Sequence, residues 1–133
     1  MTIQRTISPV DGSVYVERTL GRFCDAFESR CDAIAEELAW QMGRPIRYAP
    51  NEVRGTLERA RHMIAIGPDA LADIDVGRKE GFRRFLRREP LGVVFTVAAW
   101  NYPYLIAVNS VVPALMAGNV VILAGFQGLS TNY

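Results

Sequence analysis

The last third of the sequence lacks charge. From Pro90 to Tyr133 there is no Asp, Glu, Lys, Arg or His, so all 15 basic and 14 acidic residues lie at or before Glu89. A domain that stands alone needs a polar face on each exposed helix. We therefore expect the uncharged segment to be covered by further polypeptide, either within a larger domain or from a partner chain.

Cysteine and histidine are also scarce. Cys24 and Cys31 are the only cysteines, and their spacing is neither that of a CxxC motif nor that of a disulfide framework. On a helix they lie two turns apart, too far to bridge. We expect buried free thiols, which indicate a reducing, cytoplasmic location. Because His62 is the only histidine, the sequence predicts no metal site built from Cys and His.

Uninterrupted apolar runs are missing too. A membrane-spanning helix needs about 20 consecutive apolar residues, whereas the uncharged segment is interrupted at Asn101, Pro103, Asn109, Pro113 and Gly118. We therefore expect no membrane span. The N-terminus has no apolar stretch typical of a signal peptide.

The net charge of +1 argues against a protein that binds nucleic acid by neutralising phosphates. One basic stretch, residues 78–88, contains six Arg or Lys side chains interleaved with aromatic residues. It could form a patch for nucleic acid or an anionic surface. The near balance of total charge favours the alternative, a solvated face of a strand or helix, with no nucleic-acid partner.

Helices are predicted between the N-terminus and this basic stretch. Asp11-Gly12 lies between β-favouring runs, which predicts a hairpin arm at residues 6–18. Apolar residues at steps of three and four then predict one amphipathic helix over residues 20–38, which Gly43 ends. A second helix is predicted to begin at residues 49–51 and to end at Gly67-Pro68, with a short third helix at residues 69–74.

A strand–helix–strand unit is predicted at residues 92–124. The apolar run at 92–99 is typical of a parallel strand buried on both faces. Residues 103–117 follow as a helix that Pro113 should kink or split, and residues 120–124 form the second strand. Two parallel strands make no stable sheet alone, so this α/β unit is incomplete.

Asn101 is the candidate for chemistry. It follows the first predicted strand, and ligands of open α/β sheets bind beyond the carboxyl ends of the strands. Its side-chain amide could donate a hydrogen bond to a developing oxyanion. It could equally cap the helix that begins at Tyr102 or Pro103. Position alone does not separate these two interpretations.

Three blocks of the uncharged segment resemble the NAD(P)-dependent aldehyde dehydrogenase family. They are Glu89-Pro90-Leu91-Gly92-Val93-Val94, Trp100-Asn101-Tyr102-Pro103-Tyr104, and Pro113-Ala114-Leu115-x-Ala117-Gly118-Asn119-x-Val121. The blocks occur in the family's order and spacing. Ser8-Pro9-Val10-Asp11-Gly12 and Gly43-Arg44-Pro45 resemble earlier parts of the family pattern, so the resemblance covers the chain nearly to Leu123.

The resemblance implies an enzyme that oxidises an aldehyde to a carboxylate with NAD or NADP. In the family a cysteine thiolate attacks the aldehyde, a hydride passes to nicotinamide, and a glutamate activates water. By resemblance Asn101 is the oxyanion-hole amide, and Val97, Ala99 and Trp100 line the cofactor site. The hairpin arm and a strand at residues 80–90 would form an oligomerisation sheet, which implies a homo-oligomer in the intact family member.

The sequence departs from the family pattern in four places. Ala99 replaces a proline, and Ala124 stands where a lysine contacts the cofactor ribose; the resemblance stops there. A helical segment of the family is missing at Leu20-Gly21. Neither cysteine matches the nucleophile motif, and the general-base glutamate is absent.

We therefore expect residues 1–133 to form a single incomplete cofactor-binding domain, an N-terminal fragment that is inactive alone. The alternative is a non-catalytic module that pairs with an intact homologue through its hairpin and sheet edges.

Overall fold

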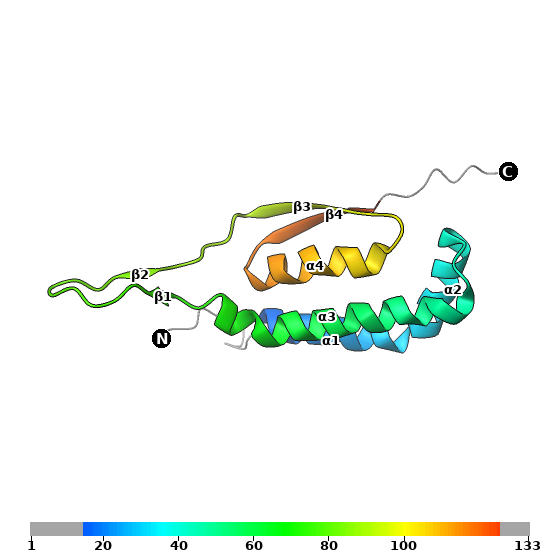
Figure 1. The fold of residues 1–133 in the computed structure, drawn as a ribbon, viewed down its shortest axis with the longest axis horizontal. Helices are drawn as coiled ribbons and strands as arrows, with labels where there is room; N and C mark the ends of the chain where they lie inside the picture. The colour runs from blue at the N-terminus through cyan, green and yellow to red at the C-terminus, as the bar shows by residue number, and fades with distance from the viewer. Residues whose placement is uncertain (1–14, 126–133) are drawn as a thin grey trace.

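The computed structural model describes residues 15–125. Its elements are α1 (Tyr15–Ser29), α2 (Cys31–Met42), a 3₁₀ turn η1 (Ile46–Tyr48), α3 (Ala49–Ala70), β1 (Ile74–Asp75), β2 (Phe85–Leu86), β3 (Val93–Ala98), α4 (Pro103–Met116) and β4 (Val120–Gly125). Helix α4 lies between the β3–β4 sheet and the layer formed by α1 and α3, while β1 and β2 extend from the body as an arm (Figure 1).

The first helical region differs from the prediction in two ways. Residues 15–18, predicted to belong to the hairpin arm, are helical, and the rest of that predicted arm lies outside the described residues. Val16 explains the difference, because it extends the apolar stripe of Leu20 and Cys24 upstream at a spacing of four and packs against the core. The single predicted helix is also broken at Arg30 (φ −105°, ψ 15°), which separates α1 from α2.

Gly43 ends α2 as predicted, in the left-handed conformation (φ 63°) that favours glycine. The prediction for the end of α3 was wrong, because this helix continues through Gly67-Pro68 to Ala70. Pro68 lies in the last turn, where its missing N–H removes one hydrogen bond while the packed face of the helix is kept. The short helix predicted at residues 69–74 does not form, since Ile74–Asp75 is strand β1.

The arm is a short antiparallel hairpin in which Ile74 pairs with Leu86 and Asp75 with Phe85. Of the strand predicted at residues 80–90, only Phe85–Leu86 forms a strand. The basic residues of the stretch 78–88 lie on and beside this exposed hairpin. The base of the arm is held by a bidentate contact from the Arg87 guanidinium to the Asp73 carboxylate, at 2.9 and 3.1 Å.

The predicted strand–helix–strand unit is confirmed. Strands β3 and β4 are parallel, with Val93 opposite Val120 and Ala98 opposite Gly125. Two details were wrong. Helix α4 runs from Pro103 to Met116 without a break at Pro113. Strand β3 is covered on one face only, because α4 packs on Thr96 and Ala98 while Phe95 on the other face remains 65% exposed.

The core lies between the helices. Val53 and Ala60 on α3 are fully buried and belong to one cluster with Leu20 of α1, Leu38 of α2 and Val112 of α4. Small side chains such as Ala60 let the helix axes approach closely, so α4 is fixed against α3. This packing determines where the loop between β3 and α4 lies.

Candidate functional site

The four predicted site residues gather at one edge of the sheet. Val97 pairs with Ala124 at the carboxyl end of β3, and Ala99, Trp100 and Asn101 follow directly. All four side chains predicted for the site are exposed. Because β3 and β4 are parallel, their carboxyl ends meet at this edge, which is where open α/β sheets bind ligands.

The local sequence explains the bend between β3 and α4. Pro103 is the first residue of α4, where its missing N–H costs no hydrogen bond. A proline also disfavours helical geometry in the residue before it, and Tyr102 has φ −145° and ψ 65°. The chain therefore turns sharply at residues 100–102, before the helix begins, and Asn101 lies on the turn.

Asn101 is not the cap of α4. The first amides of a helix have no partner inside it, and none of those at α4 donates to the Asn101 side chain. Pro103 has no N–H, and the N–H groups of Tyr104 and Leu105 donate to Glu52 Oε1 of α3 (3.0 and 3.3 Å). The regular helical bonds begin with Ile106, whose N–H donates to the Tyr102 carbonyl (2.9 Å). The capping interpretation is therefore wrong, and within residues 15–125 the side-chain amide of Asn101 has no hydrogen-bond partner.

Sequence reasoning missed Arg44 and Glu52. The Glu52 side chain is fully buried, and its Oε2 lies 2.5 Å from a guanidinium nitrogen of Arg44. A second guanidinium nitrogen donates to the Asn101 carbonyl at 2.6 Å, and the guanidinium lies 4.3 Å from the centre of the Tyr102 ring. One signal was present in the sequence, since Glu52 is a carboxylate within the apolar stripe of α3. A buried charge of this kind needs a partner.

The sheet edge offers an apolar wall. Val97 and Trp100 are 60% and 59% exposed, and no charged side chain occurs between Pro90 and Gly125. An aromatic or heteroaromatic ring fits such a surface. A diphosphate needs cations or a glycine-rich loop at a helix N-terminus, and residues 90–125 contain neither. The residues present therefore fit one wall of a dinucleotide site, the part that faces a ring.

The two thiols lie elsewhere. Cys24 is buried in the helical core, and burial raises the pKa of its thiol above the ordinary value. Cys31, at the start of α2, is partly buried, and both cysteines are free. A thiol with a raised pKa carries less thiolate at neutral pH, so Cys24 is unsuited to act as a nucleophile.

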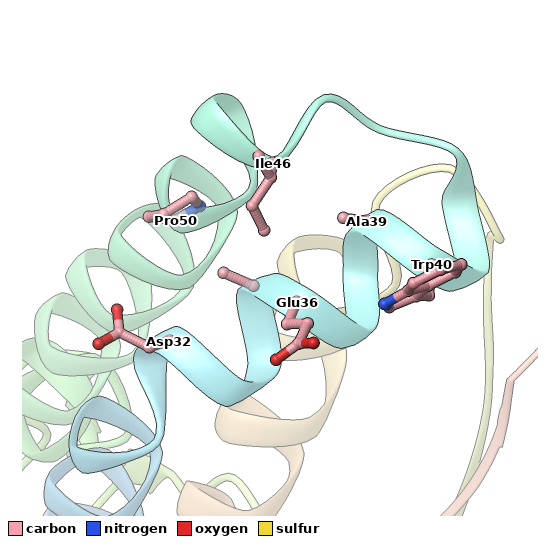
Figure 2. A pocket seen from close by; sticks show the side chains of 7 residues that line it. Asp32, Glu36, Ala39, Trp40, Ile46 and Pro50 are labelled. Carbon is pink, nitrogen blue, oxygen red and sulfur yellow. The ribbon is translucent and has the colours of Figure 1, made fainter.

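A hollow of about 540 Å³ lies between α2 and the start of α3 (Figure 2). Ala39, Trp40, Ile46 and Pro50 contribute apolar surface, and Asp32 and Glu36 lie at its side. None of the four predicted site residues lines it. This hollow is therefore separate from the sheet edge.

No group of three or more His, Cys, Asp or Glu side chains within the described range could hold a metal ion. Among the helices of residues 15–125, none is both long and apolar enough to cross a lipid bilayer.

Comparison with known proteins gives a consistent family match. The sequence profile described as the aldehyde dehydrogenase family matches residues 15–125. A succinate-semialdehyde dehydrogenase [NADP(+)] of Mycobacterium avium (strain 104) is 37% identical over 101 residues, which are 74% of this chain and 21% of that protein. A geranial dehydrogenase of Castellaniella defragrans is 29% identical over 110 residues, 82% of this chain and 23% of that protein.

Solved structures agree on the fold. The succinic semialdehyde dehydrogenase from Streptococcus pyogenes, crystallised in complex with NADP+, superposes with a TM-score of 0.77 at 19% identity. The match covers 86% of this chain and 26% of that one. The chain thus spans about a fifth to a quarter of the length of these relatives.

Proposed function

The chain belongs to the aldehyde dehydrogenase family, and on that premise we propose that it forms one edge of a site where an aldehyde is oxidised to a carboxylate with NAD or NADP. The observation that carries this proposal is that the Asn101 side chain is exposed and does not cap α4. Its side-chain amide is exposed at the carboxyl edge of the sheet, and the capping role that would otherwise explain it belongs to Glu52.

Asn101 is proposed as the oxyanion donor. When a nucleophile adds to an aldehyde, the carbonyl oxygen gains negative charge, and a neutral N–H group held in place stabilises that charge without ionising. The backbone that carries this amide is held, because Arg44 donates to the Asn101 carbonyl and Glu52 accepts the first amides of α4. The backbone therefore needs little reorganisation when the charge develops.

Val97, Ala99 and Trp100 are proposed as the wall of the cofactor site. When bound, NAD(P)+ supplies the ring that accepts the hydride. The chain's own contribution is to exclude water from one side of that ring and to orient it against the strand end. The relatives support this proposal, because the Mycobacterium avium enzyme is named for NADP+ and the Streptococcus pyogenes structure was determined with it.

We propose that the chain alone oxidises no aldehyde. Cys24 is buried among the helices with a raised pKa, and neither cysteine lies in the family's nucleophile motif. An oxyanion donor without a nucleophile cannot form the covalent intermediate on which this chemistry depends.

A chimeric enzyme tests the proposal. Residues 15–125 would replace the matched segment of the Mycobacterium avium succinate-semialdehyde dehydrogenase, and the reduction of NADP+ would be followed with succinate semialdehyde as the substrate. The proposal predicts an active chimera, while the same enzyme with the segment deleted and the isolated chain are both inactive. An isolated chain that reduces the cofactor, or a folded chimera that does not, would contradict it.

Assembly and location belong to the same proposal. The exposed hairpin β1–β2 is proposed to pair with another subunit in a homo-oligomer, with no role in binding nucleic acid. A cytoplasmic location is supported by the two unbridged thiols, Cys24 and Cys31.

A second candidate function is a non-catalytic module that binds an intact homologue. It is favoured by the β1–β2 and β3–β4 sheets. Each has only two strands, so one edge of each strand has no partner among the described residues. Exposed sheet edges accept further strands. Co-purification with an intact aldehyde dehydrogenase, without activity of the chimera, would favour this function over the first.

A further inference from the structure

We propose that Arg44 and Glu52 form a positioning unit that fixes the backbone at Asn101 and thereby sets the place of its side-chain amide. The proposed function supplies only the purpose of this unit, namely to present Asn101 to an aldehyde oxygen. The geometry stands by itself, because two buried or nearly buried side chains from the α2–α3 region hold both sides of the bend between β3 and α4.

Glu52 fixes the helical side of the bend. Its Oε1 accepts the backbone N–H groups of Tyr104 and Leu105, the second and third residues of α4. A carboxylate at this place satisfies two amides that otherwise have no partner, and its charge is favourable at the positive end of the helix dipole. These hydrogen bonds hold the first turn of α4 against α3.

Arg44 fixes the strand side. One nitrogen of its guanidinium contacts Glu52 Oε2, and another donates to the Asn101 carbonyl. The planar fork of an arginine can hold two acceptors at a set angle, which an ammonium group cannot do. The Tyr102 ring lies against the same guanidinium, 4.3 Å from ring centre to Cζ, and restricts the residue between the two anchored points.

Both supports are themselves rigid. Glu52 precedes Val53, which is fully buried at the centre of the helical core. Arg44 lies between Gly43, held in the left-handed conformation, and Pro45, whose φ is −57°. The Arg44 side chain is 14% exposed and that of Glu52 is 0% exposed, so water competes little for the contact between them. The unit therefore fixes the backbone at Asn101 relative to the helical core.

The pair is not needed for the sheet itself. The β3–β4 ladder and the bond between Thr96 Oγ1 and Ser110 Oγ join the strands and α4 without Arg44 or Glu52. A positioning role therefore predicts a local effect. Loss of the pair should loosen residues 101–105 while the ladder between β3 and β4 is kept.

Amide NMR and hydrogen exchange of the full chain test this inference. In Glu52→Gln, the Tyr104 and Leu105 amides should exchange on the order of 10- to 100-fold faster, because a neutral amide oxygen accepts a weaker hydrogen bond than a carboxylate does. In Arg44→Lys, these two amides should stay protected because the charge pair is kept, while the Asn101 side-chain amide signals shift. Exchange of the Ile122 amide in β4 serves as the internal reference.

Val53→Ala is the matched control. It removes buried packing one residue from Glu52 and lowers the free energy of unfolding without touching the bend. The inference predicts that it leaves the Asn101 side-chain signals in place. It is overturned if Val53→Ala moves those signals as far as Arg44→Lys does, or if Glu52→Gln leaves Tyr104 and Leu105 as protected as in the unmodified chain.

The two proposals fail separately. The NMR measurement reads the bend in the chain itself, whereas the chimera reads aldehyde oxidation. An intact positioning unit with an inactive chimera would count against the proposed function alone. An active chimera with an unchanged bend in both variants would count against the positioning unit alone.

Discussion

Asn119 joins the starts of both strands, because its Oδ1 accepts the backbone N–H of Gly92 at 3.0 Å. The same oxygen accepts the N–H of Leu91 (2.6 Å), and the side-chain nitrogen donates to the carbonyl of Ala114 at the end of α4 (3.1 Å). Val120, the next residue, donates its N–H to the Gly92 carbonyl at 2.8 Å. One buried amide thus fixes the edge of the sheet opposite the proposed site.

Asn119→Ala should lower the free energy of unfolding by about 2 kcal/mol, because it leaves partly buried backbone groups without partners. Asn109→Ala is the matched control, since Asn109 is an exposed asparagine on α4 and its replacement should change stability by less than about 0.5 kcal/mol. Urea denaturation followed by circular dichroism measures both. Equal effects of the two substitutions would contradict the assigned role of Asn119.

Cys24 and Cys31 should differ in reactivity. Burial raises the pKa of the Cys24 thiol and shields it, whereas Cys31 is only partly buried. Iodoacetamide at mildly alkaline pH should therefore modify Cys31 first, and Cys24 only after denaturant is added. Peptide mapping by mass spectrometry identifies the modified residue. Cys24 alkylated as fast as Cys31 in the folded chain would refute this prediction.

The base of the arm should loosen in acid. The hydrogen bond from Arg87 lowers the pKa of the Asp73 carboxyl below its ordinary value of 3.8. A carboxyl with a lowered folded pKa contributes stability above its unfolded pKa and loses it as the pH falls through the folded value. The NMR signals of Arg87 should therefore stay constant above pH of about 4 and move below it.

Asp73→Asn provides the control for that titration. The amide keeps the size of the side chain and removes its proton equilibrium, so the acid step at Arg87 should disappear. A step of the same size in Asp73→Asn would show that another group controls the arm.

The uncovered sheet face should make the chain associate. Phe95 is 65% exposed on the face of β3 that α4 does not cover, and exposed apolar faces of this kind promote aggregation. Phe95→Lys should raise the fraction of monomer in sedimentation velocity experiments and change the free energy of unfolding little. Trp40→Lys, at an 83% exposed position on α2, is the control. If it has the same effect, association does not depend on the sheet face.

The strand–helix–strand unit was predictable because its signals are local. Val93–Ala98 is a short apolar run, Pro103 marks the first turn of α4, and Gly118, with φ 81°, ends it. The sheet edge with Val97, Ala99, Trp100 and Asn101 followed from the rule for parallel strands. The break at Arg30 was not predictable, because the apolar spacing continues across it into α2.

The remaining differences arise from contacts between distant parts of the chain. The local sequence predicts that Pro68 ends one helix and that Pro113 kinks or splits another. Both helices nevertheless continue through these prolines, where α3 and α4 pack against each other. Glu52 lies more than fifty residues from the amides that it caps, so no local pattern assigns it to α4. Arg44 was not predicted for the same reason, because its acceptor, the Asn101 carbonyl, is also more than fifty residues away in the sequence.

The central claim is that the Asn101 amide stabilises an oxyanion, and the kcat of the chimeric enzyme tests it most directly. Asn101→Ala should lower kcat by about 10²- to 10³-fold, as loss of one such donor does elsewhere, while Asn109→Ala leaves kcat unchanged. A chimera whose kcat is the same with alanine at position 101 would contradict the account.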